Sequence, residues 1–326
     1  MTQSHRISLS TPDKHSGITV DLLNRGAAIA GIKLQGVGKL PEVDTVLKYP
    51  STADYDEDAF YLGSTVGPVA NRLDGGRLVL PTGTLSIDIN ERDRQNLLHG
   101  GDLGLHQQIF QASPTRDSHR LVFSLALPHL SDGFPGDRLV TIRYELIDHT
   151  SLQCDYMAST DRPTVMNLAN HAYFNLGGPL AKHELRIFAK DYTPLNDRQI
   201  PTGTIANLSE ENATGCCLDF REWRPLGSQV LDHNFVLSAG SKLRAAASLR
   251  LPDSNLQLDV LTTQAALQVY TGDGLTAPFS ARAGVCLETQ GFPDAPNQPA
   301  FPSILIEPGQ TYRQRTIYRF GKITDA

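Results

Sequence analysis

Several features that mark particular classes of protein are missing from this sequence of 326 residues. It has no run of about 18 consecutive apolar residues, which a membrane-spanning helix would need. Charged residues make up only 20% of the chain and the net charge is −6. The composition is therefore not that of a disordered protein, and the basic surface that attracts nucleic acid is lacking. We expect a globular protein that binds neither membranes nor nucleic acid.

Cysteine is also scarce. The four cysteines are Cys154, Cys216, Cys217 and Cys286, and no two of them have the C-x-x-C spacing of zinc knuckles and redox sites. A chain of this length buries about three-quarters of its unfolded surface and needs no disulfide framework, so we expect reduced, mostly buried thiols. Residues Met1–Arg6 lack the apolar stretch of a signal peptide, which predicts a cytosolic protein. Whether it is a monomer or a homodimer stays open.

The motifs of nucleotide-binding proteins and zinc proteases are absent as well. No G-x-x-x-x-G-K-S/T, G-x-G-x-x-G or H-E-x-x-H pattern occurs. The segment Gly63–Gly67 comes nearest to a hydrolase nucleophile elbow, but its serine stands in the wrong position. The acidic cluster Asp54–Asp58 lacks the glycine and distal glutamate of a calcium loop, and we interpret it as a solvated helix face. The sequence thus predicts no metal site.

What the sequence does contain is a clear period of two. Val140, Ile142, Tyr144 and Leu146 alternate with polar residues, as a strand with one wet face requires. The same alternation predicts strands that include residues 121–125 and 256–260, and a hairpin in which Pro81-Thr-Gly83 joins strands at 77–80 and 84–90. The alanines of 242–251 favour a helix while their neighbours favour a strand, and we interpret the segment as a strand. One surface helix is expected at 51–58, after the capping box Ser51-Thr-Ala-Asp54.

Turn residues are abundant, with 27 glycines and 20 prolines. About one residue in seven is thus a turn former, which favours short elements over long helices. No internal repeat and no linker divides the chain. We predict an all-β protein in which residues 1–326 form a single large antiparallel β-sandwich.

Polar residues in apolar or small surroundings are the candidates for chemistry. They lie in Asn71-Arg72, Leu98-His99, Asn170-His171-Ala-Tyr173, Asp232-His233 and Val285-Cys-Leu-Glu288. Taken singly, His171 could be a hydrogen-bonded core histidine, His99 could end a turn, and Arg72 could pair with a surface carboxylate. Glu288 is more informative, because its apolar neighbours indicate a buried strand and a buried glutamate is uncommon unless it is paired or functional. Together, these residues form a plausible acid/base site.

The succession of these segments resembles the aldose 1-epimerase, or galactose mutarotase, family over almost the whole chain. The segments that match are Ala70-Asn-Arg72, Leu98-His-Gly-Gly101, Gly133-Phe-Pro-Gly136, Asn170-His-Ala-Tyr-Phe-Asn-Leu176, Asp232-His233, Leu287-Glu288, Phe292-Pro-Asp-Ala-Pro-Asn297 and Pro308-Gly309. The resemblance implies a galactose mutarotase-like β-sandwich with a sugar bound across one sheet. The sequence differs from the family pattern at Pro68, at Leu105-His-Gln-Gln108 and at Gln310.

The resemblance also implies roles for individual residues. His171 matches the general acid and Glu288 the general base, whereas Arg72, His99 and Asp232 match residues that bind the sugar ring and its hydroxyls. Asn71 lies in the same binding segment, and Tyr173 is expected to pack beneath the sugar.

The implied reaction interconverts the α and β anomers of free hexoses such as galactose and glucose and needs no cofactor. Glu288 takes the C1 hydroxyl proton while His171 protonates the ring oxygen. Their attraction should raise the pKa of His171 and lower that of Glu288. Two alternatives remain: a hexose-phosphate 1-epimerase and a non-catalytic carbohydrate-binding module.

Overall fold

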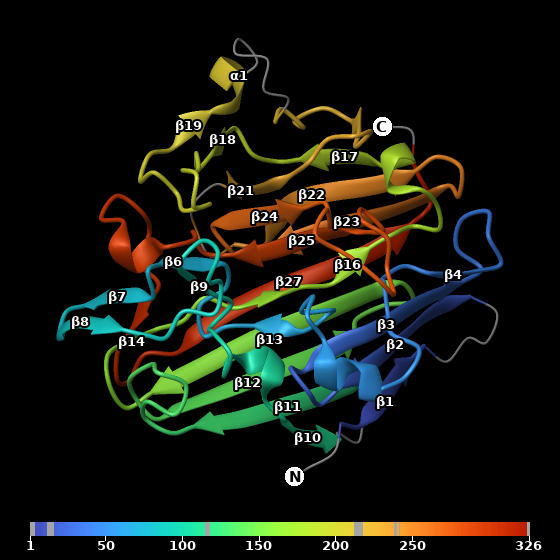
Figure 1. Ribbon diagram of the computed structural model, residues 1–326. Helices are drawn as coiled ribbons and strands as arrows, with labels where there is room; N and C mark the ends of the chain where they lie inside the picture. Colours follow the sequence, from blue (N-terminus) through green and yellow to red (C-terminus); the bar gives the residue numbers. More distant parts are fainter. Residues whose placement is uncertain are drawn as a thin grey trace.

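The computed structural model describes residues 4–11, 16–114, 118–211, 218–237, 240 and 242–324, whose regular secondary structure is almost entirely β-strand (Figure 1). The longest helical segment among them is the five-residue 3₁₀ helix η1 (Ala53–Glu57), and α1 (Leu208–Glu211) is a single turn. None of these helices is long and apolar enough to cross a membrane. The all-β prediction is confirmed.

In the part of the chain that the structure describes, the strands form three large sheets and four two-stranded ribbons. The nine-stranded sheet has the order β10 (Gln111–Pro114), β11 (Arg120–Leu127), β12 (Arg138–Leu146), β13 (Ser151–Thr160), β27 (Tyr312–Gly321), β23 (Leu256–Thr262), β22 (Arg244–Leu251), β17 (Glu184–Ile187) and β20 (Arg224–Pro225). The four-stranded sheet has the order β1 (Arg6–Ser10), β2 (Gly17–Leu23), β3 (Ala28–Gln35) and β4 (Glu42–Asp44). The six-stranded sheet has the order β16 (Tyr173–Phe174), β25 (Val285–Gln290), β24 (Ala266–Tyr270), β21 (Asp232–Val236), β18 (Asp191–Tyr192) and β19 (Ala206–Asn207).

The ribbons contain Arg72 and border Asn71, His99 and His171. They pair β5 (Thr65–Val66) with β15 (Ala169–Asn170), β6 (Arg72–Asp74) with β9 (Asn96–Leu98), β7 (Arg77–Leu80) with β8 (Gly83–Ser86), and β14 (Thr164–Val165) with β26 (Leu305–Ile306). Every pairing between these named strands is antiparallel, as predicted.

The alternating apolar residues predicted from the sequence form the buried face of the nine-stranded sheet. In β12, Val140, Ile142, Tyr144 and Leu146 are buried, whereas the intervening residues are partly or fully exposed. The predictions of strands at 121–125, 256–260 and 242–251 are confirmed by β11, β23 and β22. In the last of these, pairing with β17 and β23 outweighs the helix propensity of alanine.

One hydrophobic cluster joins the three sheets. It includes Val20 and Ile32 from the four-stranded sheet, Phe123 and Tyr144 from the nine-stranded sheet, and Leu267 from the six-stranded sheet. Each such buried side chain contributes about 1.5–3 kcal/mol. We propose on this basis that the chain forms a single domain, as the sequence predicts.

Two local predictions need correction. The helix expected at 51–58 is the short 3₁₀ helix η1, whose N-cap Thr52 makes no side-chain cap hydrogen bond. Asp54 accepts the N–H of Ser51 at 3.0 Å, but Ser51 Oγ accepts the N–H of Ala53 at 3.2 Å instead of that of Asp54, so the capping box is incomplete. Asp58 is not on a solvated face, because its half-buried carboxylate turns inward and accepts the N–H groups of Phe60 and Leu62. The strand expected at 84–90 ends at Ser86, and only two residues separate β7 from β8, since Leu80 pairs with Gly83.

The cysteine prediction is confirmed where the structure describes it. Cys154 and Cys286 are free and buried. Cys216 and Cys217 lie outside the described residues.

The Gly133-Phe-Pro-Gly136 segment anchors the ribbons that carry Arg72. Phe134 is buried with Leu73 of β6 and Leu97 of β9. Next to this loop, Asp132 and Arg138 form a bidentate pair at 2.6 and 3.0 Å whose side chains are 1% and 0% exposed. A buried charge that loses its partner is strongly destabilising, so this pair fixes the loop in place.

We predict that Arg138→Met lowers the free energy of unfolding by about 3–5 kcal/mol, because Asp132 would remain as an unpaired buried charge. Urea denaturation measures this change. As a matched control, Lys182→Met breaks the exposed Lys182–Asp253 pair and should cost less than about 1 kcal/mol. Equal effects of the two substitutions would contradict the interpretation.

Candidate active site

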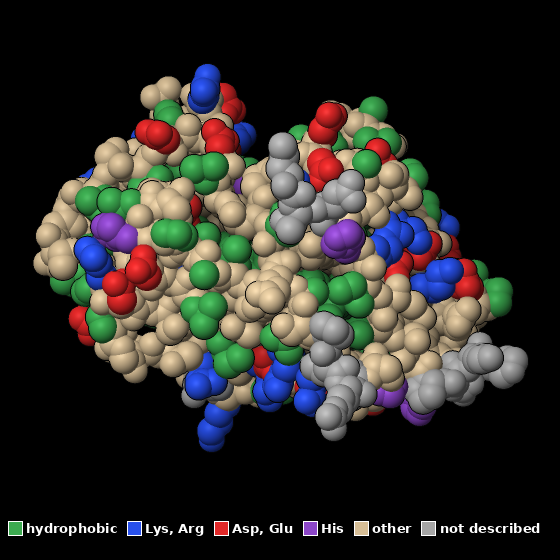
Figure 2. All heavy atoms as spheres, turned by 90° about the horizontal axis from the view of Figure 1, so that it is seen from below, with side chains coloured by type: hydrophobic (Ala, Val, Ile, Leu, Met, Phe, Trp, Pro, Cys, Tyr) green, Lys and Arg blue, Asp and Glu red, His purple; other side chains and the backbone are tan. Residues whose placement is uncertain are grey.

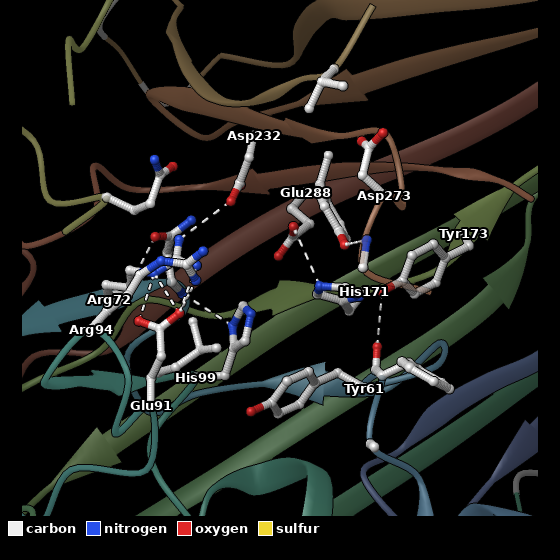
Figure 3. Close-up of a pocket in the computed structure, with 18 residues that line it drawn as sticks. Tyr61, Arg72, Glu91, Arg94, His99, His171, Tyr173, Asp232, Asp273 and Glu288 are labelled. Carbon is white, nitrogen blue, oxygen red and sulfur yellow. Dashed lines mark hydrogen bonds and ion pairs between the residues drawn. The ribbon is translucent and has the colours of Figure 1, made fainter. Parts of the chain in front are cut away.

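A cavity of about 500 Å³ lies against the six-stranded sheet and the β6–β9 ribbon (Figure 3). All seven residues singled out from the sequence line it: Asn71, Arg72, His99, His171, Tyr173, Asp232 and Glu288. Asp232 and Glu288 come from the sheet itself, and Arg72 comes from the ribbon. The fold thus brings the candidates into one hollow.

His171 and Glu288 face each other across this cavity. His171 lies between β15 and β16, where its backbone is held by hydrogen bonds to Ser64 and Gly63. Glu288 lies in the fully buried strand β25. Nε2 of His171 is 3.7 Å from Oε1 of Glu288, and the side chains are 5% and 2% exposed. Oε2 of Glu288 is buried and has no hydrogen-bond partner in the described part of the chain, so it is available to a ligand hydroxyl.

Burial dominates the ionisation of this pair. It lowers the pKa of His171 to about 4, with a smaller contribution from the charge of His106. It raises the pKa of Glu288 well above its ordinary value, and the charge of Asp232 adds to this while Arg72 opposes it. The sequence predicts a raised pKa for His171 and a lowered pKa for Glu288, and both directions are wrong. Loss of water penalises both charged forms more than a partner at 3.7 Å favours them.

His99 is held as a neutral hydrogen-bond donor. Its Nδ1 accepts the backbone N–H of Asn71 at 3.1 Å, so the proton of the neutral ring is on Nε2. Burial lowers the pKa of His99 well below its ordinary value, with further lowering by His171, Arg72 and His106. The chain turns directly after His99 because Gly100 adopts a φ of +85°, which glycine tolerates. Gly100 also packs closely on Gly67, since a Cβ at residue 100 would lie 2.1 Å from the carbonyl oxygen of Gly67.

The same protonation argues against a metal at this site. His99, His171 and Glu288 each offer one atom within 4.8 Å of the others, which resembles a set of metal ligands. A ligating histidine, however, coordinates through a bare nitrogen and donates its other N–H to an acceptor. In His99 the bare nitrogen is already used by Asn71, and the other ring nitrogen carries the proton. The donor set therefore does not fit a metal ion.

Arg72 is fixed by two carboxylates. Its Nε and Nη2 bind Glu91 at 2.9 Å, and its Nη1 lies 3.4 Å from Asp232. Burial alone would raise the pKa of Glu91, but the hydrogen bonds and charge of Arg72 outweigh it and lower that pKa. Gln268 donates to the other oxygen of Asp232 at 2.6 Å. The result is a rigid polar wall with both donors and acceptors.

Sequence reasoning missed several residues of the lining. Glu91 and Arg94 stand in a charged loop without periodicity, so nothing distinguished them from surface charges. Tyr61 packs its ring against His99 and His171, with centroids 4.6 and 5.8 Å away (Figure 3). Tyr270, Gln199 and Asp273 complete the polar part of the wall.

The differences from the family pattern lie outside the cavity. Pro68, Leu105–Gln108 and Gln310 are not among the described residues that line it. Tyr173 does line it, but the residue is only 2% exposed and its hydroxyl donates to the carbonyl of Phe60 at 3.1 Å. Only a small part of its ring is therefore accessible to a ligand.

Comparison with known proteins identifies the relatives of this chain. A galactose mutarotase from Rattus norvegicus is 33% identical over 324 residues, which cover 93% of this chain and 91% of the rat protein. An aldose 1-epimerase from Escherichia coli is 31% identical over 337 residues, covering 96% and 94%. The crystal structure of an aldose epimerase homologue from C. elegans superposes with a TM-score of 0.90 at 26% identity, covering 98% and 100%. Since the aldose 1-epimerase family model also matches residues 8–319, the chain belongs to the aldose 1-epimerase family.

Proposed function

We propose that this chain interconverts the α and β anomers of free hexoses such as galactose and glucose. The observation that carries the proposal is the placement of His171 Nε2 and Glu288 Oε1 3.7 Å apart, in the lining of a cavity of about 500 Å³ that is large enough for a hexose. An acid and a base at this spacing reach the ring oxygen and the C1 hydroxyl of one pyranose, which are bonded to the same carbon.

Two proton transfers accomplish the reaction. Glu288 as carboxylate takes the proton from the C1 hydroxyl, His171 as imidazolium protonates the ring oxygen, and the bond between C1 and the ring oxygen breaks to give an aldehyde. Rotation about the C1–C2 bond presents the other carbonyl face. Reclosure returns both protons and yields the second anomer.

The pair carries one titrating proton throughout. Ring opening begins from charged His171 and ionised Glu288 and ends with neutral His171 and protonated Glu288, which is the state that ring closure requires. These are two arrangements of the same proton count. Burial stabilises the neutral arrangement, so sugar hydroxyls that hydrogen-bond to Oε2 of Glu288 must help to create the charged one.

The remaining residues hold the sugar. We assign His99 Nε2–H and the Arg72 guanidinium as donors and Asp232 as an acceptor, with Asn71 acting through His99 and Tyr173 as apolar wall. These groups exchange hydrogen bonds with water for hydrogen bonds with sugar, so the net binding energy per contact is small.

The charges of the lining favour a free sugar over a hexose phosphate. Both arginines that line the cavity already bind Glu91, and Arg72 also contacts Asp232. Within the described lining, a phosphate dianion would find no arginine without a carboxylate partner, and it would add charge near Glu288. A non-catalytic binding module, the other alternative, has no need of the acid and base that face each other here.

A polarimetric assay discriminates among these three functions. We expect the protein to accelerate the mutarotation of fresh α-D-galactose or α-D-glucose, and hexose 6-phosphates to be poor substrates and poor competitors. Faster turnover of the 6-phosphate would favour the phosphate epimerase. Sugar binding without acceleration would favour the binding module.

We predict that Glu288→Gln lowers kcat by at least about 10²–10⁴-fold while galactose still binds, because the amide keeps the shape but cannot accept the proton. Polarimetry measures the rate and calorimetry the affinity. Glu184→Gln, at a surface pair with Arg250, is the control and should retain full activity. Near-wild-type mutarotation by Glu288→Gln would remove this residue from its assigned role.

We predict a bell-shaped pH profile for kcat/KM. At low pH the pair takes up a second proton and loses its base; at high pH it gives up its only proton and loses its acid. Since burial lowers the pKa of His171 to about 4 and raises that of Glu288, the acid limb should lie well below the ordinary histidine range near 6.5. An acid limb centred near pH 6.5 would show that burial does not control the pair.

The predictions about cellular setting belong to the same proposal. A cytosolic protein fits the two free, buried cysteines. On the face shown in Figure 2, Lys and Arg side chains lie beside Asp and Glu, which supports a protein without a nucleic-acid partner. A monomer or a homodimer that needs no cofactor is the state we propose.

A further inference from the structure

One strand contacts both nitrogens of the same imidazole. Cys286 and Glu288 are two residues apart in β25, so their side chains point to the same face. Glu288 Oε1 faces Nε2 of His171, and Sγ of Cys286 lies 3.5 Å from Nδ1 of the same ring. The register of β16 and β25, which pairs Tyr173 with Cys286, keeps the thiol at this position.

We propose that Cys286 is a positioning residue that serves Nδ1 of His171 in both of its protonation states. The proposal rests on the proposed function, in which His171 alternates between imidazolium and neutral ring. A thiol has one donor and free lone pairs. Because Nε2 gives its proton to the ring oxygen, Nδ1 keeps its N–H in both the imidazolium and the neutral ring, and the sulfur of Cys286 can accept that N–H throughout.

His99 provides the contrast within the same cavity. The two imidazole centroids are 5.2 Å apart, yet Nδ1 of His99 faces a backbone N–H, which can only donate. Protonation of His99 would place two N–H groups against each other, so this ring is held neutral. The partner of Nδ1 thus distinguishes the histidine that cycles a proton from the one that only donates.

The surroundings keep the thiol in its protonated form. Cys286 is 0% exposed, and burial raises its pKa well above the ordinary value, with additions from Glu288 and Asp232. The other titratable groups around His171 and Cys286 are His99, His106, Tyr61, Tyr173 and Tyr270. Burial raises the pKa of all three tyrosines and lowers that of both histidines, so these five stay neutral while the pair exchanges its proton.

Three substitutions test the proposal. Cys286→Val puts an apolar side chain, larger by about one methyl group, in place of the thiol and removes both donor and acceptor, whereas Cys286→Ser keeps both. Cys154→Val is the matched control, since Cys154 is equally buried in β13 and lies in the core instead of the cavity. The measurements are kcat and KM by polarimetry and the pKa of His171 by NMR titration of the ring without sugar.

We expect Cys286→Val to lower kcat about tenfold, the size of one lost hydrogen bond, with KM within about twofold of wild type. It should also lower the pKa of His171 further, because the charged ring loses the stronger, charge-assisted bond. Cys286→Ser should restore most of both quantities, and Cys154→Val should change neither.

Wild-type kcat and an unchanged His171 pKa in Cys286→Val would overturn the proposal. So would equal losses in the Ser and Val variants, since the contact would then be packing alone. If the wild-type protein does not accelerate mutarotation, the proposed function fails, and the NMR titration still decides whether Cys286 hydrogen-bonds to Nδ1.

Discussion

The structure depends on placing an acid and a base where water cannot solvate them. His171 and Glu288 are almost completely buried, and both shifts of pKa favour the uncharged forms. In water, the carboxylate and the imidazolium would each be solvated and would exchange protons with the solvent. In the mechanism that we propose, the cavity brings the charged and neutral arrangements closer in free energy, so that one proton can pass between the pair and the sugar in either direction.

The sheets supply this environment, and the loops around them supply its precision. Pairing of β16 with β25 and of β15 with β5 fixes the segment that contains His171. Two segments that resemble the family but take no part in the chemistry support the opposite wall. Phe134 is buried beneath the β6–β9 ribbon, and Asp294 donates its N–H to the carbonyl of Arg72 and accepts that of Asp74. Arg72 is thus held through its backbone as well as its guanidinium.

The sequence was informative where the period of two is strict and where a polar residue interrupts an apolar run. The strand at 140–146 and the buried glutamate at 288 were predictable for these reasons, and the resemblance to the family brought the remaining site residues together. Glu91 and Arg94 were not predictable, because a charged loop has no period that shows whether it covers a cavity or faces solvent. The pKa shifts were also beyond sequence reasoning, since burial depends on how completely distant strands enclose a side chain.

The proposed function therefore links sugar binding to the protonation of this site. Without sugar, Oε2 of Glu288 has no partner among the described residues, and the neutral form of the carboxyl is favoured. Sugar hydroxyls replace the missing polar environment and lower the cost of ionisation. Part of the free energy of the hydrogen bonds is then used to create the charged pair instead of tightening the complex. Under the proposed function, we therefore expect weak substrate binding as a consequence of the same burial that makes the proton transfer reversible.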